Sequence, residues 1–292
     1  MNFLNDYEFY ENINIKKYNS YKLNVICKYL VFIKNIDELV SLIEYLKENN
    51  INYLILGNGT NVIFSKDYFD GVIIKLDKLN NLKVNNTEVY VECGYPLVKL
   101  SKEIFKYGLV GLEFASGIPG LLGASVAMNA GAYNKDMASV VKEVTILNDK
   151  LEIVKLTNKD LSFEYRNSIL KKHKDYICLS AVLSLEYGDI NQSKQLIEER
   201  RTRRLETQPL DYPSAGSVFR NPDNMHAGEL IEKCNLKGYN INGAEVSVKH
   251  ANFIINTGNA KYNDIIELIK KVQKEVKNNY NVDLILEQEI IK

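Results

Sequence analysis

The segment from Glu113 to Tyr133 restricts the fold most, because it packs small residues into an otherwise apolar run. It reads Glu-Phe-Ala-Ser-Gly-Ile-Pro-Gly-Leu-Leu-Gly-Ala-Ser-Val-Ala-Met-Asn-Ala-Gly-Ala-Tyr. A core strand favours branched residues, so small residues at this density indicate that something large lies against the main chain. A flat cofactor or a phosphate would suit such a backbone. Close packing of a helix on a strand at Gly120 and Gly123 is the alternative.

A second glycine segment, Gly57-Asn58-Gly59-Thr60-Asn61, directly follows the apolar run 53–56, which we predict to be a strand. Glycines at this point allow several backbone N–H groups to converge on a diphosphate. The segment is not a Rossmann fingerprint, because Val62 stands at the third glycine position and a strand is predicted where that fold needs a helix. A tight turn with an Asn-Gly corner is the alternative.

The segment 212–222 holds Ser217 between glycine and proline residues. A serine hydroxyl fixed in this way can act as an acid when charged groups elsewhere manage the charge that develops on the reactant. Candidates for those groups are Arg166, in Tyr-Arg-Asn-Ser, and Glu289, in Leu-Glu-Gln-Glu. Taken singly, Arg166 would be a surface ion-pair residue, Ser217 a turn residue and Glu289 a solvated carboxylate.

Composition limits the classes of protein. The chain has 292 residues, 46% of them hydrophobic, which predicts two or three domains. Lys+Arg 37 balances Asp+Glu 37, so no general field attracts nucleic acid or anionic lipid. The four cysteines form no C-x-x-C pair, which argues against a zinc cluster and favours reduced cysteines in a cytoplasmic protein. The N-terminus does not resemble a secretory signal, and no apolar run approaches the ~20 residues of a membrane span.

Apolar periodicity predicts alternating helices and strands. Helices are expected from Asp37, from Pro96, over 191–205, over 227–234 and around 265–276. Strands are expected at 53–56, 62–64, 72–74, 89–91, 144–147, 177–179, 246–248, 253–255 and 284–286. The last strand would bring Glu287 and Glu289 to one face by its period of two. His250, with no second ligand-type residue beside it, is expected to be structural.

These segments together resemble UDP-N-acetylenolpyruvoylglucosamine reductases, the MurB family, along nearly the whole chain. The short spacing between Arg166 and Ser217 is similar to that of the type II members. Two departures stand out: residues 18–25 lack the usual Gly-Gly, and Asn134 replaces a usual glycine.

The resemblance implies an α+β fold: a two-part FAD-binding domain of the vanillyl-alcohol-oxidase (PCMH) type and a smaller α+β substrate-binding domain. We predict an N-terminal extension over 1–20, an FAD-binding domain over 21–188 split near 77–80, a connecting helix over 189–206 and a substrate-binding domain over 207–292. The last strand would return Glu289 to the active site.

The resemblance also implies the reaction. The enolpyruvyl ether of UDP-N-acetylglucosamine would be reduced to UDP-N-acetylmuramate, a step of peptidoglycan precursor synthesis that supports cell shape and division. Non-covalent FAD, reduced by NADPH, would deliver hydride to C3. Ser217 would supply the proton to C2, while Arg166 and Glu289 stabilise the carboxylate. A small-molecule UDP-sugar would be the partner of a cytoplasmic monomer or weak oligomer, with no nucleic acid, membrane or metal involved.

The same similarity assigns the binding residues. FAD would be bound by Gly57, Asn58, Gly59, Thr60, Asn61, Gly117, Ile118, Pro119, Gly120, Gly123, Ala124, Ser125, Asn129, Gly131 and Ala132. Substrate would be bound by Tyr133, Arg220 and Asn221. Two alternatives stay open: an FAD-dependent oxidase or dehydrogenase of the same superfamily acting on another small substrate, and a non-catalytic flavin- or nucleotide-binding module.

Overall fold

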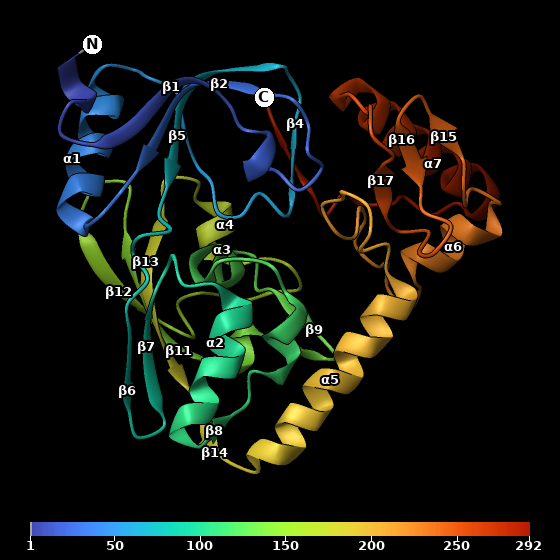
Figure 1. The fold of residues 1–292 in the computed structure, drawn as a ribbon. Helices are drawn as coiled ribbons and strands as arrows, with labels where there is room; N and C mark the ends of the chain where they lie inside the picture. The colour runs from blue at the N-terminus through green and yellow to red at the C-terminus, as the bar shows by residue number, and fades with distance from the viewer. Residues whose placement is uncertain (1) are drawn as a thin grey trace. The chain divides into compact units, whose positions relative to one another are not determined.

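Figure 1 shows the fold of the computed structural model, which describes residues 2–292. The chain divides into two compact units. The first unit comprises residues up to 11, 29–57 and 71–201, and the second comprises 12–28, 58–70 and 202–292. The boundary between them therefore falls within four elements of the chain. These are β1 (Glu8–Asn14), β2 (Ile26–Phe32), β5 (Tyr68–Lys75) and α5 (Ile190–Thr207).

A four-stranded sheet has the order β1-β2-β5-β3, in which β3 (Tyr53–Ile55) pairs parallel with β5. Helix α1 (Ile36–Glu48) begins at Asn35, whose side chain accepts a hydrogen bond from the Glu38 N–H at 2.9 Å. Its apolar face joins the hydrophobic core that also contains Val72 and Ile74 of β5. The apolar residues at helical spacing after Asp37, which are Leu39, Leu42, Ile43 and Leu46, are all buried, and this confirms the helix expected from Asp37.

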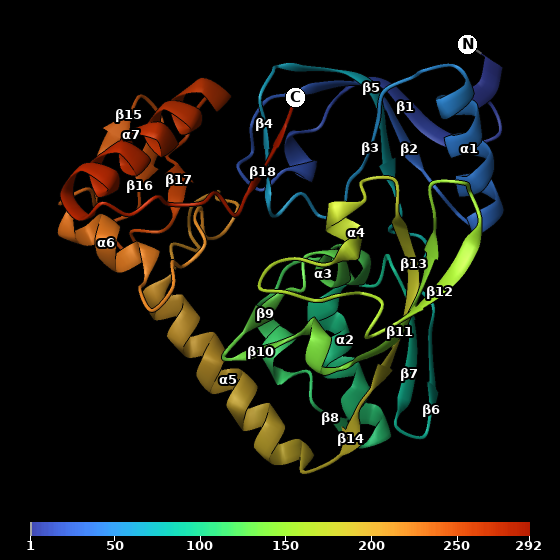
Figure 2. The ribbon, with the colours of Figure 1, turned by 180° about the vertical axis from the view of Figure 1, so that it is seen from behind.

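The larger sheet of the first unit is antiparallel and has the order β12-β11-β13-β7-β6 (Figure 2). Its strands are β6 (Leu82–Asn85), β7 (Glu88–Glu92), β11 (Val141–Leu147), β12 (Ile153–Thr157) and β13 (Ile177–Ser184). The helices of this part are α2 (Leu97–Glu103), α3 (Leu122–Ala127) and α4 (Ile169–Lys172). A Cβ on Gly123 of α3 would lie 2.8 Å from the Cβ of Cys93, so this glycine permits close packing of the helix beside β7. Packing thus accounts for Gly123.

Two short two-stranded antiparallel sheets complete the first unit. One pairs β8 (Leu109–Val110) with β14 (Glu186–Tyr187), and the other is a hairpin of β9 (Gly131–Ala132) and β10 (Lys135–Asp136). The hairpin turns through Tyr133 and Asn134, whose φ angles are 55° and 59°. Asparagine tolerates this left-handed backbone better than most residues, which explains how it replaces glycine at position 134.

The second unit contains a parallel pair, β4 (Val62–Phe64) with β18 (Glu289–Ile291), and a sheet of order β15-β16-β17. The three strands of that sheet are Asn240–Ile241, Ala244–Val246 and Ile254–Asn256. Helices α6 (Ala227–Lys233) and α7 (Tyr262–Tyr280) follow the predicted periodicity. The predicted strand at 284–286 is wrong: only an isolated bridge joins Leu286 to Phe219, and the strand forms at β18.

Short 3-10 helices lie at Asn2–Leu4, Lys16–Tyr18, Ile104–Tyr107, Glu113–Gly117 and Met137–Ser139. Residues 8–14, inside the predicted N-terminal extension, form an edge strand of the four-stranded sheet. Over residues 2–292, none of the helices has the length and apolar character that crossing a membrane requires.

Candidate active site

Ser217 lies in a loop of the second unit, residues 213–217, which we call the serine loop. The backbone of this loop requires a glycine at position 216. Gly216 has φ +76°, and a Cβ placed on it would meet no atom within 4 Å. Ser217 itself is half-buried and forms an isolated bridge with Phe253. Within residues 2–292 its hydroxyl makes no hydrogen bond. The hydroxyl is therefore available to a bound molecule.

The C-terminal segment runs beside this loop and leads to Glu289. The Glu287 N–H donates to the Val218 carbonyl at 2.8 Å, and the Glu289 N–H donates to the Asn61 carbonyl at 2.9 Å. Glu289 pairs in register with Val62 and has an exposed side chain. Its carboxylate makes no hydrogen bond or ion pair with any described residue. One short backbone segment therefore connects the serine loop with Glu289.

Arg220 and Asn221 follow the serine loop and differ in what they contact. The Arg220 Nε is buried and has no hydrogen-bond partner among the described residues. A guanidinium nitrogen buried without a partner is unfavourable, so an acceptor from a bound molecule would relieve it. The Asn221 Oδ1 instead accepts from the Ala227 N–H at 3.1 Å, next to the start of α6. Arg220 is thus better suited than Asn221 to bind an anion.

Arg166 is held in the first unit by the β9 strand. Its Nη2 donates to the Gly131 carbonyl at 2.8 Å, and its guanidinium lies 5.1 Å from the Tyr165 ring centroid. The backbone of Arg166 has φ 56°, in the tight turn closed by Glu164 and Asn167. A non-glycine residue in this region is strained by about 1 kcal/mol or more, a feature that concentrates at functional sites.

Tyr133 projects from the β9–β10 turn and is 39% exposed. The Arg200 guanidinium of α5 lies 4.3 Å from the centroid of its ring. This cation–π contact orients the tyrosine while leaving part of the ring accessible.

Gly59 satisfies a steric need of the chain itself. Its φ is +63°, and a Cβ would lie 2.1 Å from the Tyr18 carbonyl oxygen, so residues 18–19 pack directly on the glycine loop. Within the described chain, the N–H groups of Gly59 and Thr60 donate no hydrogen bond. Unpaired N–H groups next to a left-handed glycine can bind an anionic oxygen. The donor set of this loop therefore fits a diphosphate.

Gly57, in the first unit, contacts both the α3 segment and a buried lysine. Its Cβ position is 3.4 Å from the Ala124 Cβ, which brings the two glycine-rich segments together. The Lys75 Nζ donates to the Gly57 carbonyl and lies 3.2 Å from the Asp77 carboxylate. Burial lowers the pKa of Lys75, and the Asp77 charge opposes this shift. Lys75 is not among the predicted site residues, although its position directly after the apolar run 72–74 is a signal that the sequence offers.

Several predicted cofactor residues are occupied by structural contacts. The Asn129 amide donates to Asp136 at 2.9 Å and to the Glu164 carbonyl at 3.0 Å, and its oxygen accepts from the Ala138 N–H. The Ser125 hydroxyl donates to the Leu121 carbonyl at 2.8 Å within its own helix. Contacts from Asn129 to a ligand would therefore come from its backbone.

The predicted site residues are distributed over both units. Ser217, Glu289, Arg220, Asn221 and 58–61 belong to the second unit, whereas Arg166, Tyr133, Gly57 and 117–132 belong to the first. The Asn61 amide donates to the Glu287 carbonyl at 3.1 Å, which ties the glycine loop to the Glu-Gln-Glu segment within the second unit.

His250 behaves as a structural histidine. Its Nδ1 accepts from the Asn252 N–H at 3.2 Å, and its ring lies 4.8 Å from that of Phe253. Burial lowers its pKa. Across residues 2–292, no three or more Cys, His, Asp or Glu side chains gather as a metal would require.

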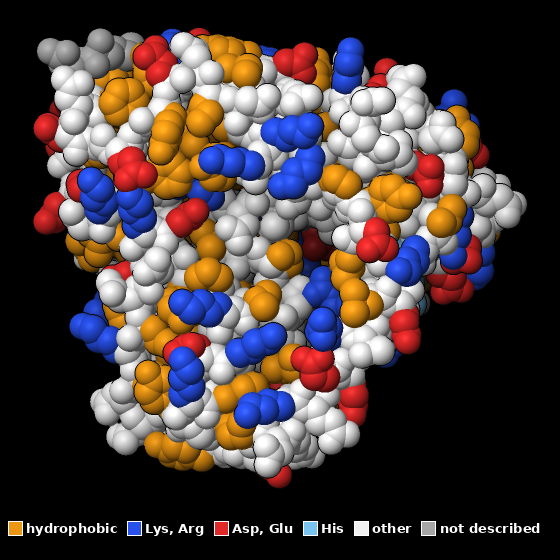
Figure 3. Space-filling model, in the orientation of Figure 1, with side chains coloured by type: hydrophobic (Ala, Val, Ile, Leu, Met, Phe, Trp, Pro, Cys, Tyr) orange, Lys and Arg blue, Asp and Glu red, His pale blue; other side chains and the backbone are white. Residues whose placement is uncertain are grey.

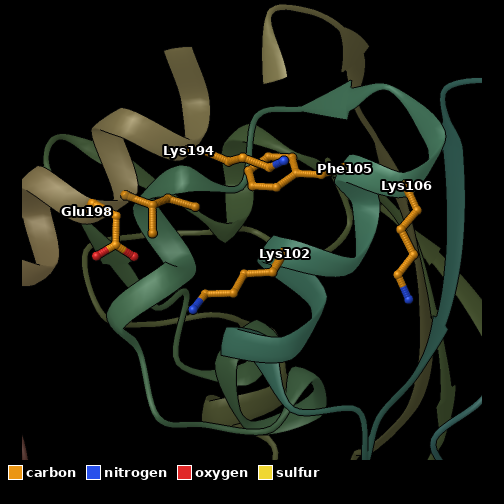
Figure 4. A pocket seen from close by; sticks show the side chains of 6 residues that line it. Lys102, Phe105, Lys106, Lys194 and Glu198 are labelled. Atoms are coloured by element: carbon orange, nitrogen blue, oxygen red, sulfur yellow. The ribbon is translucent and has the colours of Figure 1, made fainter. Parts of the chain in front are cut away.

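A cavity of about 480 Å³ opens between α2 and its following turn on one side and α5 on the other (Figure 4). It is lined by Lys102, Phe105, Lys106, Lys194, Ile197 and Glu198, none of which is a predicted site residue. Figure 3 shows basic, acidic and hydrophobic side chains interspersed over one face of the molecule, in keeping with its balanced charge.

Comparisons with known proteins cover nearly the whole chain. The family model for the C-terminal domain of UDP-N-acetylenolpyruvoylglucosamine reductase matches residues 208–291, and that for an FAD binding domain matches 27–157. The reductase of Caldanaerobacter subterraneus subsp. tengcongensis is 44% identical over 288 residues, which cover 99% of this chain and 95% of that protein.

Solved structures agree. The crystal structure of the reductase MurB from Thermus caldophilus has a TM-score of 0.83 and 28% identity, covering 98% of this chain and 99% of that chain. A solvent-stable cholesterol oxidase, 15% identical with a TM-score of 0.52, covers 64% of this chain and 39% of that one. This last likeness concerns the fold alone.

Proposed function

Because the chain belongs to the UDP-N-acetylenolpyruvoylglucosamine reductase family, we propose that it reduces the enolpyruvyl ether of UDP-N-acetylglucosamine to UDP-N-acetylmuramate, with NADPH as the reductant. The observation that carries the proposal is 44% identity over 99% of the chain. The protein is an oxidoreductase with FAD as its cofactor, and its fold is the predicted α+β, vanillyl-alcohol-oxidase type. We retain the division into domains 21–188 and 207–292 as a proposal.

FAD, when bound, would supply the hydride that adds to C3 of the enolpyruvyl group, with NADPH as its source. The N–H groups of Gly59 and Thr60 are donors suited to its diphosphate. The further residues that would hold it are Gly57, Asn58, Asn61, Gly117, Ile118, Pro119, Gly120, Gly123, Ala124, Ser125, Asn129, Gly131 and Ala132. No histidine or cysteine stands in a context that suggests a covalent flavin link.

Ser217 donates the proton that C2 needs after hydride has added to C3. A serine hydroxyl is a weak acid, so it can act only because the intermediate is strongly basic. The absence of a hydrogen bond on this hydroxyl among residues 2–292 leaves it accessible to the substrate. Ser217 is therefore assigned as the general acid.

Arg166 and Glu289 act on the substrate carboxylate, where negative charge develops as hydride arrives. The planar guanidinium of Arg166, oriented by the Gly131 carbonyl, can donate two parallel hydrogen bonds to a carboxylate. Glu289 is proposed to act on the same group. Donors fixed before the reaction lower the barrier because they need no reorganisation.

Three residues are proposed to bind the remainder of the substrate. The buried Nε of Arg220, which has no partner among residues 2–292, suits the diphosphate, and the partly exposed ring of Tyr133 suits the sugar. Asn221, whose Oδ1 is engaged at α6, has its amide N–H₂ left for the substrate. We further propose a cytoplasmic monomer or weak oligomer that supports peptidoglycan synthesis, and through it cell shape and division.

The test uses the purified, FAD-loaded protein under anaerobic conditions. NADPH alone should bleach the flavin absorption, and UDP-N-acetylglucosamine enolpyruvate should then restore it and yield UDP-N-acetylmuramate. Reoxidation by oxygen but not by the enolpyruvyl substrate would instead identify an oxidase. A flavin that NADPH does not bleach would identify a binding module.

A further inference from the structure

Gln288 is a buried polar side chain between the two glutamates of the Glu-Gln-Glu segment, with an exposed fraction of 3%. Its amide nitrogen donates to three consecutive carbonyl oxygens of the serine loop. They belong to Ala215 at 3.0 Å, Gly216 at 3.2 Å and Ser217 at 3.4 Å. Carbonyl oxygens only accept hydrogen bonds, so these contacts fix which end of the amide faces the loop.

Tyr21 holds the opposite end of this amide. Its hydroxyl donates to the Gln288 Oε1 at 3.0 Å, and its side chain is completely buried. Burial raises the pKa of Tyr21, so the hydroxyl remains a donor over the range in which enzymes work. The Tyr21 carbonyl in turn accepts from the Asn256 amide at 2.8 Å, and the Asn256 N–H donates to the Pro213 carbonyl at 2.8 Å. The network therefore hydrogen-bonds to carbonyl groups at both ends of residues 213–217.

The serine loop needs such a restraint because Gly216 does not restrict the conformation of its own backbone. Gly216 is left-handed and has open space around its Cβ position, so the backbone there has more freedom than any other residue would allow. The amide of Gln288 supplies the missing restraint on the carbonyls at 215–217. The same residue precedes Glu289, whose N–H is bonded to the Asn61 carbonyl. One residue thus restrains the serine loop and begins the strand that carries Glu289.

We propose that Gln288, oriented by Tyr21, is a positioning residue for proton transfer: it fixes the backbone of Ser217 so that the hydroxyl reaches C2 of the substrate. The inference rests on the proposed role of Ser217. A displacement of about 1 Å at a reacting group can slow a step by about 10²-fold, so the restraint has a kinetic consequence. A buried amide that only stabilised the fold would have no preference for one half-reaction.

The first test compares Gln288→Met, Tyr21→Phe and Gln273→Met in the FAD-loaded protein. Methionine keeps the length of glutamine and removes its hydrogen bonds. Gln273 is the matched control, because its amide donates to the Leu284 carbonyl at 2.9 Å in the same C-terminal segment. Flavin content, the rate of reduction by NADPH and the rate of reoxidation by the enolpyruvyl substrate are measured for each variant.

Gln288→Met should leave flavin content and reduction unchanged, slow substrate-dependent reoxidation by roughly 10-fold or more, and raise the solvent deuterium isotope effect on that step. Tyr21→Phe should show the same pattern with a smaller slowing. Gln273→Met should lower the unfolding temperature and change neither half-reaction. If Gln288→Met does not fold, Tyr21→Phe decides, and a wild-type reoxidation rate in it would overturn the proposal.

The double variant Ser217→Ala/Gln288→Met separates the inference from its premise. If Gln288 acts through Ser217, the double variant reoxidises no more slowly than Ser217→Ala alone. Multiplied effects would show that Gln288 acts elsewhere and would overturn the positioning role. A wild-type rate in Ser217→Ala would remove the premise itself, whereas a slow Ser217→Ala with a normal Gln288→Met would remove only the inference.

Discussion

Gly59 shows that a glycine in a proposed cofactor-binding loop can be required by the packing of the chain itself. Its Cβ position is 2.1 Å from the Tyr18 carbonyl oxygen, and its φ is +63°. Backbone cannot move aside as a flexible side chain does, so we expect Gly59→Val to lower the unfolding temperature of FAD-free protein sharply. Gly120 has no positive φ, and its Cβ position meets only the Ser125 hydroxyl, at 2.8 Å. Gly120→Ala is therefore the mild control.

Thermal unfolding before and after FAD addition distinguishes the two explanations. A Gly59→Val protein that folds at the wild-type temperature but binds no flavin would show that the glycine makes room for the cofactor instead.

Ser217→Ala tests the acid directly. We expect reduction of the flavin by NADPH to stay near the wild-type rate, because only the second half-reaction needs a proton at C2. Reoxidation by substrate should slow by at least ~10²-fold, the usual range for a lost general acid. Stopped-flow absorption follows both steps. Ser214→Ala, in the same loop, is the control, and equal slowing in both variants would point to loop damage rather than lost acidity.

At the scale of elements, local pattern predicted the helices well and the last strand badly. Helix α1 buries all four residues that its periodicity indicated. Strand β18 forms by pairing with β4, which lies far away in the sequence, so no local pattern around residues 289–291 predicts it. Short-range pattern reports amphipathic faces, but it does not report which distant strand will supply hydrogen bonds.

The β9–β10 hairpin gives a prediction at this scale. Asn134 has φ 59°, so Asn134→Ala should destabilise the turn by about 1 kcal/mol, whereas Asn134→Gly should be neutral or slightly stabilising. Because Tyr133 projects from the same turn, Asn134→Ala should also raise KM for the UDP-sugar more than it changes kcat. Urea unfolding and steady-state kinetics measure the two effects. Equal stability of both variants would mean that the turn accepts alanine by rearranging.

At the scale of the whole molecule, motifs indicated the candidate site segments but not the residues that support them. Ser217, Arg166 and Glu289 stand in short motifs that sequence comparison can find. The roles proposed for Gln288 and Tyr21 depend on a hydrogen bond between positions 267 residues apart, which single-sequence reasoning does not supply. Lys75 is a similar case, because the carbonyl to which it donates belongs to Gly57, which follows a different strand.

His250 predicts how global stability depends on pH. Burial is the main cause that lowers its pKa below the ordinary 6.5. Below pH 6.5 the unfolded chain therefore binds more protons at this site than the folded one, so stability is lost as the pH falls. His250→Asn keeps an acceptor for the Asn252 N–H and removes the titration. Its unfolding temperature should fall less than that of the wild type between pH 7.5 and about 5. Parallel curves would mean that His250 has equal proton affinity in both states.

Arg166 and Glu289 are both proposed to act on the substrate carboxylate, so their losses should be coupled. If both stabilise one developing charge, Arg166→Lys and Glu289→Ala should be non-additive in the substrate half-reaction. Glu289→Ala alone should raise that barrier by about 3 kcal/mol, as for a lost oxyanion donor, with flavin content unchanged. Reoxidation is measured by rapid kinetics in the wild type, both single variants and the double variant, which completes the double-mutant cycle.

Glu287→Ala is the matched control, since its carboxylate is two residues away on the same segment. Should Glu287→Ala be damaging and Glu289→Ala silent, the carboxylate that meets the substrate is Glu287, and the assignment of the Glu-Gln-Glu segment shifts by two residues.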